Sequence, residues 1–242
     1  RAWPTLMVVD PRGNVLASQA GEIPFEAFDP LVAGMIDYFD SLGEINREPI
    51  ELALEGAGMP TGALSFPGKV LADVAGNRLF IADSNHHRIV IADLTTYEVL
   101  DVIGTGQRGF VDGDYAEATF DQPQGMALKD EMLYVADVNN HAIRVVDLGS
   151  QEVTTLAGTG VMGRGGVRPG FTMTDLLATD LRSPWDVEFG EGNLLYIAMA
   201  GTHQIWEIDL DTSLMQVSVG NGREAALNSS PTNSELAQPS GI

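Results

Sequence analysis

The chain has 242 residues, of which 44% are hydrophobic and 19% charged, and it contains no cysteine. This length and apolar content can supply one large or two smaller cores, and the lack of cysteine excludes disulfides, thiolate metal sites and thiol nucleophiles from this stretch. A formal net charge of −21 disfavours nucleic acids and anionic membranes as partners, and the apolar runs are too short to cross a bilayer. We expect a soluble protein and favour the cytoplasm, although the sequence does not identify the compartment.

The first 42 residues predict a small unit of two strands and a helix. Residues 5–9 read as an apolar strand, the DPRGN segment after them is a strong turn signal, and residues 15–18 read as the returning strand of a hairpin. An N-cap at Asp29 and a first helical residue at Pro30 then predict a helix. Its apolar residues recur at helical spacing until Leu42.

This order of elements, opened by Trp3-Pro4-Thr5, resembles the C-terminal half of a thioredoxin-like domain. Members of that family carry a cis-proline, often followed by Thr, just before the third strand of the sheet and facing the redox cysteines. Pro4 matches that position, and the resemblance implies that residues 1–42 are the C-terminal part of such a domain. The family's cysteine pair would lie upstream, so no catalytic residue is assigned in this chain. The alternative for Pro4 is an ordinary trans-proline at a strand start.

Residues 43–63 mix charges with Gly and Pro and predict an interdomain linker. From residue 64 the sequence repeats. The copy at 120–160 contains four short apolar stretches separated by polar or Gly-containing turns, which predicts an antiparallel four-stranded meander. Further copies lie at 64–106 and 181–222, and another starts at 236. One meander copied several times is the signature of a β-propeller with one blade per copy.

The copies align residue by residue. All four start with a proline, and the three complete copies carry a histidine in their middle turn and close in Gly-x-Gly; the prolines are Pro67, Pro123, Pro184 and Pro239, and the histidines are His87, His141 and His203. A residue that recurs once per blade is expected to hold the turn together, whereas a catalytic or metal-binding histidine is usually singular. Asp83 and Asp137 also recur and are expected to accept backbone N–H bonds.

The repeated motif resembles the NHL repeat, named for an Asn-His-Leu-like triplet. The matches are ADSNHHRI at 82–89, ADVNNHAI at 136–143 and AMAGTHQI at 198–205, where Met199 replaces the acidic residue. The expected fold is mainly β, a partial NHL-type propeller of three four-stranded blades plus the start of a fourth. It would follow the βα remnant of a thioredoxin-like α/β domain, and this succession is similar to that of a family that joins the two domain types.

Insertions between blades sit on one rim of a propeller, where repeat proteins usually bind. Here they span residues 106–122, 161–183 and 223–238. We expect them to contact a protein or small-molecule ligand on the propeller face, rather than nucleic acid or membrane. The candidate contact residues are Arg108, Phe110, Asp112, Asp114, Arg164 and Arg168.

An acidic cluster in the first insertion, formed by Asp112, Asp114, Glu117 and Asp121, has oxygen ligands of the kind that Ca²⁺ takes. Its spacing does not match an EF-hand loop and only this insertion contains it, so we predict neither a metal nor a cofactor. No nucleophile elbow, zinc-protease motif or P-loop is present in the sequence.

The sequence therefore favours a propeller that acts as a binding scaffold, attached to a thioredoxin-like domain. One alternative is part of a thiol-disulfide or peroxide oxidoreductase whose redox cysteines lie upstream. A second is a metal-dependent propeller hydrolase or lyase, which needs polar residues from different blades to meet on the axis. The first-strand residues Val70, Met126 and Val187 are instead apolar.

Overall fold

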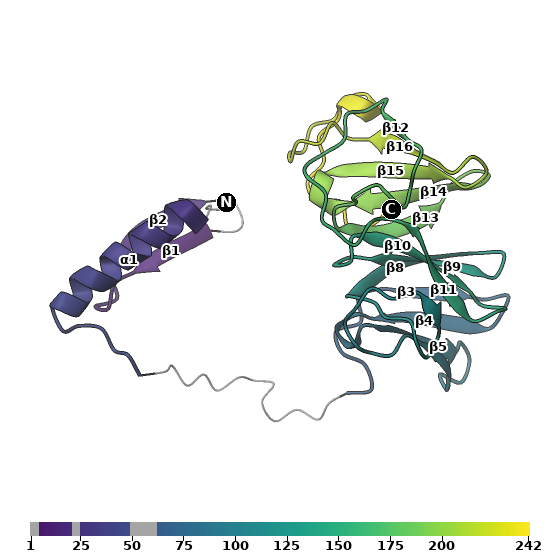
Figure 1. The fold of residues 1–242 in the computed structure, drawn as a ribbon, viewed down its shortest axis with the longest axis horizontal. Coiled ribbons are helices and arrows are strands. Elements are labelled where there is room, and N and C mark those ends of the chain that lie inside the picture. Colours follow the sequence, from purple (N-terminus) through teal and green to yellow (C-terminus); the bar gives the residue numbers. More distant parts are fainter. Residues whose placement is uncertain (1–4, 21–24, 49–61) are drawn as a thin grey trace. The chain divides into compact units, whose positions relative to one another are not determined.

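The computed structural model describes residues 5–20, 25–48 and 62–242 (Figure 1). The chain divides into two compact units, residues 1–59 and 60–242. Pro4 lies outside the described residues, as does most of the segment expected to be the linker. Within the described part, no helix is long and apolar enough to cross a membrane.

The first unit contains the predicted hairpin. Strands β1 (Thr5–Val9) and β2 (Val15–Ala20) form a two-stranded antiparallel sheet. Asp10 fixes the turn between them, because its Oδ1 accepts the backbone N–H of Arg12 at 2.9 Å and that of Asn14 at 2.8 Å. The side-chain amide of Asn14, which donates to Oδ2 at 3.0 Å, together with these backbone bonds stabilises the ionised carboxylate and holds the pKa of Asp10 below its usual value.

Helix α1 (Phe25–Ser41) begins four residues before the N-cap expected at Asp29, so that predicted boundary is wrong. Pro30 lies inside the helix, where it removes a backbone donor. The helix begins early because its apolar stripe does: Phe28, Val32, Met35 and Phe39 share one face and are more buried than most of their neighbours. The chain after the helix stays with this unit, since Arg12 forms an ion pair with Glu44.

The second unit consists of three antiparallel sheets stacked one beside the next (Figure 1). Each sheet contains four strands that pair in sequence order, as the repeat predicted. The first blade is built from β3 (Val70–Asp73), β4 (Arg78–Asp83), β5 (Arg88–Asp93) and β6 (Val99–Ile103). The second is built from β8 (Pro123–Lys129), β9 (Met132–Asp137), β10 (Ala142–Asp147) and β11 (Glu152–Ala157). The third is built from β13 (Pro184–Phe189), β14 (Leu194–Met199), β15 (Gln204–Asp209) and β16 (Leu214–Val219).

The insertions add a short fifth strand to two blades, which the repeat did not predict. Strand β7 (Gly113–Asp114) pairs with β11, and β12 (Thr172–Met173) pairs with β16. Each covers the outer edge of the blade that follows it in sequence. An exposed strand edge presents unpaired backbone groups, so the insertions act as edge covers as well as rim loops.

The core lies between neighbouring blades. One apolar cluster joins blade 1 to blade 2 and includes Phe80, Ile89 and Leu133; a second joins blade 2 to blade 3 and includes Ile143 and Trp206. Because side chains alternate along a strand, β10 sends Val146 into the first cluster and Ile143 into the second. Blade 2 is therefore packed against a neighbouring blade on each face.

Candidate functional site

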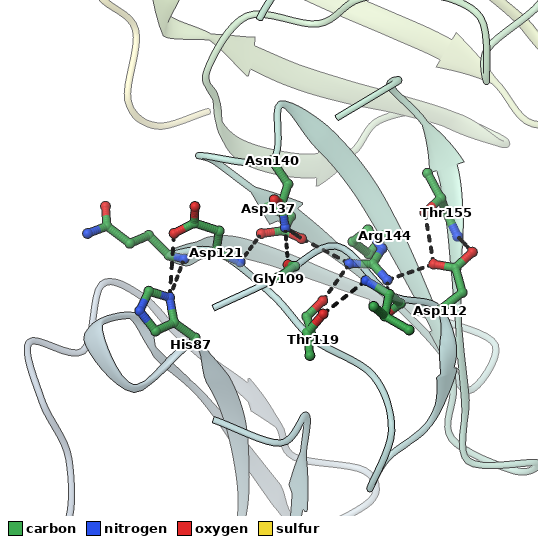
Figure 2. Close-up of polar contacts among 11 residues, drawn as sticks. His87, Gly109, Asp112, Thr119, Asp121, Asp137, Asn140, Arg144 and Thr155 are labelled. Atoms are coloured by element: carbon green, nitrogen blue, oxygen red, sulfur yellow. Dashed lines mark hydrogen bonds and ion pairs between the residues drawn. The ribbon is translucent and has the colours of Figure 1, made fainter. Parts of the chain in front are cut away.

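The chain enters blade 2 through a backbone joint that is held from two blades (Figure 2). His87 of blade 1 accepts the backbone N–H of Gln122 on its Nδ1 at 3.2 Å. Asp137 of blade 2 accepts the neighbouring N–H, that of Asp121, on its Oδ1 at 2.8 Å. Of the two adjacent residues that lead into the blade, Gln122 is thus bonded to the preceding blade and Asp121 to its own.

The same histidine bond recurs at the next two joints. His141 accepts the N–H of Ser183 at 3.1 Å, and His203 accepts that of Gln238 at 3.2 Å. All three histidines adopt a left-handed backbone, with φ of 51°, 50° and 56°, which aims their rings at the following blade. The recurring histidine therefore stabilises the contact between blades in addition to its own turn.

The joint requires an unprotonated Nδ1, because a protonated nitrogen cannot accept a hydrogen bond. Burial lowers the pKa of His141 below 6.5, and nearby Arg182 lowers it further while Asp121 opposes them. A lowered pKa means that the folded state binds this proton less readily than the unfolded state. Its contribution to stability is present above a pH of about 6.5 and is lost as the pH falls through the folded pKa.

Replacing His141 with asparagine, which tolerates left-handed backbone, is expected to cost about 1 kcal/mol of unfolding free energy at a pH of about 7.5. The cost should shrink at a pH of about 5.5, because proton binding by His141 in the unfolded wild-type chain then already lowers the stability of the wild type. Urea unfolding of both proteins at the two pH values measures this. A cost that does not change with pH would contradict the proposed role of Nδ1.

The recurring carboxylate differs between blades. Burial raises the pKa of Asp83, but the Ser65 N–H, His86 and Arg88 outweigh it, so the pKa lies below its usual value. Burial raises the pKa of Asp137 to about 6, although Arg144 and Asn140 oppose this. In blade 3 the position is Met199, whose Sδ lies 3.4 Å from the backbone N of Arg182.

A fully buried arginine links blade 2 to its insertion. The guanidinium of Arg144 lies between Asp137 at 3.0 Å and Asp112 at 2.6 Å (Figure 2). It also donates to the backbone carbonyls of Thr119 and Val111, each at 2.9 Å. The repeat gave no sign of this residue, because Val90 and Trp206 occupy the aligned positions.

The four rim candidates of the first insertion belong to this network or to its turns. Arg108 donates to Asp121 at 2.6 Å, and the ring of Phe110 lies 5.0 Å from the Arg144 guanidinium. Asp112 also accepts from the hydroxyl of Thr155 at 2.9 Å. Asp114 caps a turn by accepting the N–H groups of Ala116 and Glu117. These side chains hold the insertion in place, even where they are partly exposed.

The structure does not bring the acidic cluster together as one site. Asp112 faces Arg144, Asp114 caps its own turn, and Asp121 accepts from Arg108 and Asn139. Among the residues that the structure describes, no group of three or more His, Asp or Glu is arranged to hold a metal ion.

One ion pair reaches across the first strands of the blades. Lys69 of the segment leading into β3 donates to Asp186 of β13 at 2.8 Å, and the backbone N–H of Ile242 approaches the same oxygen at 3.3 Å. The two charges neutralise each other. Polar residues from different blades therefore meet here, which the apolar first-strand positions did not predict.

The second insertion behaves differently from the first. The guanidinium groups of Arg164 and Arg168, both rim candidates, make no hydrogen bond or ion pair with any described residue. Sequence reasoning missed the exposed apolar residues beside them; Met162 is 55% and Phe171 is 60% exposed. Aligning the two insertions could have found the difference, since Met162 and Arg182 replace the paired Arg108 and Asp121.

Comparison with known proteins finds relatives that match this chain over nearly its whole length. No family model matches it. It is 42% identical to the Arabidopsis thaliana protein Suppressor of Quenching 1, chloroplastic, over 100% of this chain and 23% of that protein. It is 37% identical to NHL repeat-containing protein 2 of Gallus gallus over 99% of this chain and 35% of that protein. The chain thus spans about a quarter to a third of these relatives.

A solved structure shows the same kind of fold. The chain superposes with a TM-score of 0.50 on a structural genomics protein of unknown function from Bacteroides thetaiotaomicron. The two are 20% identical over 65% of this chain and 36% of that one, which is a likeness of fold alone. Together with the repeated joint and the stacked sheets, the sequence matches lead to one assignment. The chain is an NHL-repeat β-propeller segment, similar over nearly its whole length to NHL repeat-containing protein 2.

Proposed function

We propose that this chain is a binding scaffold whose inter-blade insertions present a fixed surface to a protein or small-molecule ligand. One observation carries the proposal: the insertions are tied to the blades by backbone pairing and buried polar contacts. Strands β7 and β12 attach two of them to outer strands, and the guanidinium of Arg144 anchors the first from within. Such preorganisation lowers the entropy cost of binding.

The finer part of the proposal is that the first unit is the C-terminal part of a thioredoxin-like domain. The hairpin β1–β2 followed by α1 supports it, together with Trp3-Pro4-Thr5 in the sequence. The redox chemistry of such a domain would belong to the longer protein, because this chain has no cysteine. Carbon-13 shifts of Pro4 test the link, and a trans-proline signature would count against it.

Photo-cross-linking from opposite faces of the propeller tests the scaffold. A benzoylphenylalanine is placed at Phe110, Phe171 or Leu227 in the three insertions, or at Tyr97 in a hairpin turn at the other end of the strands. Phe171 and Tyr97 are a matched pair, being aromatic and 60% and 71% exposed. We expect cellular adducts from at least one insertion position and not from Tyr97. Adducts that form as readily from Tyr97 as from the insertion positions would contradict the proposal.

A further inference from the structure

The second insertion, residues 161–183, carries three arginines whose side chains pair with no described carboxylate. Within the described part of the chain, the side chains of Arg164, Arg168 and Arg182 form no hydrogen bond or ion pair, in a chain whose net charge is −21. The two carboxylates of the insertion are engaged locally. Asp175 accepts the backbone N–H of Ala178 at 3.1 Å, and Asp180 accepts the hydroxyl of Thr159 at 2.6 Å.

The first insertion shows that this is a local departure from the repeat. Both insertions make the same backbone bond, from Gly109 to the Phe120 carbonyl at 3.1 Å and from Gly163 to the Leu181 carbonyl at 2.8 Å. Beside that bond, the first insertion places the ion pair of Arg108 and Asp121. The second places Met162 and Arg182 at the same two positions. The cation of the pair is thus replaced by a methionine and the carboxylate by an arginine, which leaves a cation there without a carboxylate beside it.

The backbone that carries these side chains is held at several points. The buried side chain of Gln204 accepts the N–H of Val167 at 3.1 Å and donates to its carbonyl at 2.7 Å. Gly163 is bonded to Leu181, and β12 is paired with β16. Arg164 and Arg168 each follow an anchored residue. Phe171 follows three residues later, with its N–H bonded to the Arg168 carbonyl at 3.2 Å.

The same insertion exposes three large apolar side chains. Met162, Phe171 and Leu177 are 55%, 60% and 58% exposed. Arginine, methionine and aromatic residues are the types enriched at the centres of protein interfaces. Here they stand on an anchored backbone, so little ordering entropy opposes binding.

We propose that this cationic insertion, defined by Met162, Arg164, Arg168, Phe171, Leu177 and Arg182, docks a short protein segment with a few carboxylates beside an aromatic or aliphatic anchor. The arginines suit bidentate carboxylate recognition, and the exposed apolar side chains suit the anchor. A long polyanion such as nucleic acid or an anionic membrane would meet the field of the remaining acidic surface. A short segment meets mainly the local cations. The assignment rests on the scaffold function proposed above and names the partner chemistry of one insertion.

The test uses the full chain and a labelled twelve-residue peptide of Glu, Asp, Leu and Phe, with a second peptide in which Lys replaces each acid. Fluorescence anisotropy is expected to show binding of the acidic peptide only. Binding should weaken about tenfold or more in the double variant Arg164→Ser, Arg168→Ser, and should weaken with added salt. Arg223→Ser is the matched control, because Arg223 is an exposed arginine in the neighbouring insertion; it should bind as the wild type does.

Because the two guanidinium groups form no hydrogen bond or ion pair with any described residue, the double variant should keep the wild-type melting temperature, which separates lost docking from lost folding. Equal binding of the acidic and basic peptides, or an unaffected double variant, would overturn the assignment. So would no peptide binding, or tighter binding to vesicles of equimolar phosphatidylcholine and phosphatidylserine than to the acidic peptide. Cross-links from Phe110 or Leu227 without peptide binding would leave the scaffold standing and remove only this docking site.

Discussion

Replacing Arg144 with methionine is expected to lower the unfolding free energy of the propeller by about 3–5 kcal/mol. The guanidinium is fully buried, and it joins Asp137 of the blade to Asp112 of the insertion. Methionine would fill part of the space, but it would leave the Asp137 carboxylate buried without its cation. The carbonyls of Thr119 and Val111 would lose a donor as well.

The matched control is Arg108→Met in the same insertion. Arg108 also pairs with a carboxylate, at 2.6 Å from Asp121, but its side chain is 72% exposed. Water screens the exposed guanidinium, and the buried Asp121 carboxylate keeps the side-chain amide of Asn139 as a donor, so the loss should cost less than that of Arg144, about 1–2 kcal/mol. Urea unfolding of the two variants measures the difference. Similar costs for both would show that burial of Arg144 does not make its pairing essential.

The pH dependence of the Arg144 variant offers an independent check. Burial raises the pKa of Asp137 to about 6 in the folded protein, and Arg144 is the main opposing influence. Without Arg144 the pKa should rise further. An acid whose pKa is raised by folding favours the folded state at low pH and loses that advantage as the pH rises through the folded pKa. The cost of Arg144→Met should therefore be larger at a pH of about 8 than at about 5.

Arg144 also shows which part of the site could not be predicted from the sequence. The blades could be predicted because their strands, turns and joints recur at fixed spacing, and each copy supports the others. Arg144 stands in a position that the other blades fill with Val90 and Trp206, so alignment predicts an apolar side chain. Its partner Asp112 lies 32 residues earlier in an insertion. No periodic pattern connects two such positions, and only folding brings them together.

The rim illustrates the same limit. Composition and placement predicted six residues that contact a ligand, yet the side chains of four of them hold the first insertion in place. Whether an arginine in a loop is free depends on a carboxylate elsewhere in the fold, as with Arg108 and Asp121. The short strands β7 and β12 were not predicted for a related reason. A strand of two residues is too short to show the alternation of apolar and polar residues from which strands are predicted. The helix start was missed because Pro30 was a stronger local signal than the apolar position at Phe28.

Substituting alanine for Gly158 is expected to destabilise the propeller by about 3 kcal/mol or more, because two costs add. Gly158 closes blade 2 with φ of +105°, a conformation that side-chain-bearing residues rarely adopt. A Cβ at this position would lie 2.4 Å from the His141 carbonyl oxygen and 2.7 Å from the Cα of Ala142. Both are backbone atoms that cannot rotate away, so β10 would have to shift.

Gly165→Ala separates the two costs. Gly165 also has a positive φ, +73°, but a Cβ there would have no heavy atom within 4 Å. This variant should lose only the unfolding free energy that the left-handed backbone costs, about 1–2 kcal/mol. The shift at Gly158 should also reach the joint to blade 3, because His141 accepts the Ser183 N–H at 3.1 Å. Hydrogen exchange of the Ser183 amide should therefore accelerate in Gly158→Ala and stay unchanged in Gly165→Ala. Equal unfolding costs in urea, with Ser183 equally protected in both variants, would show that the blade ending tolerates the added methyl group.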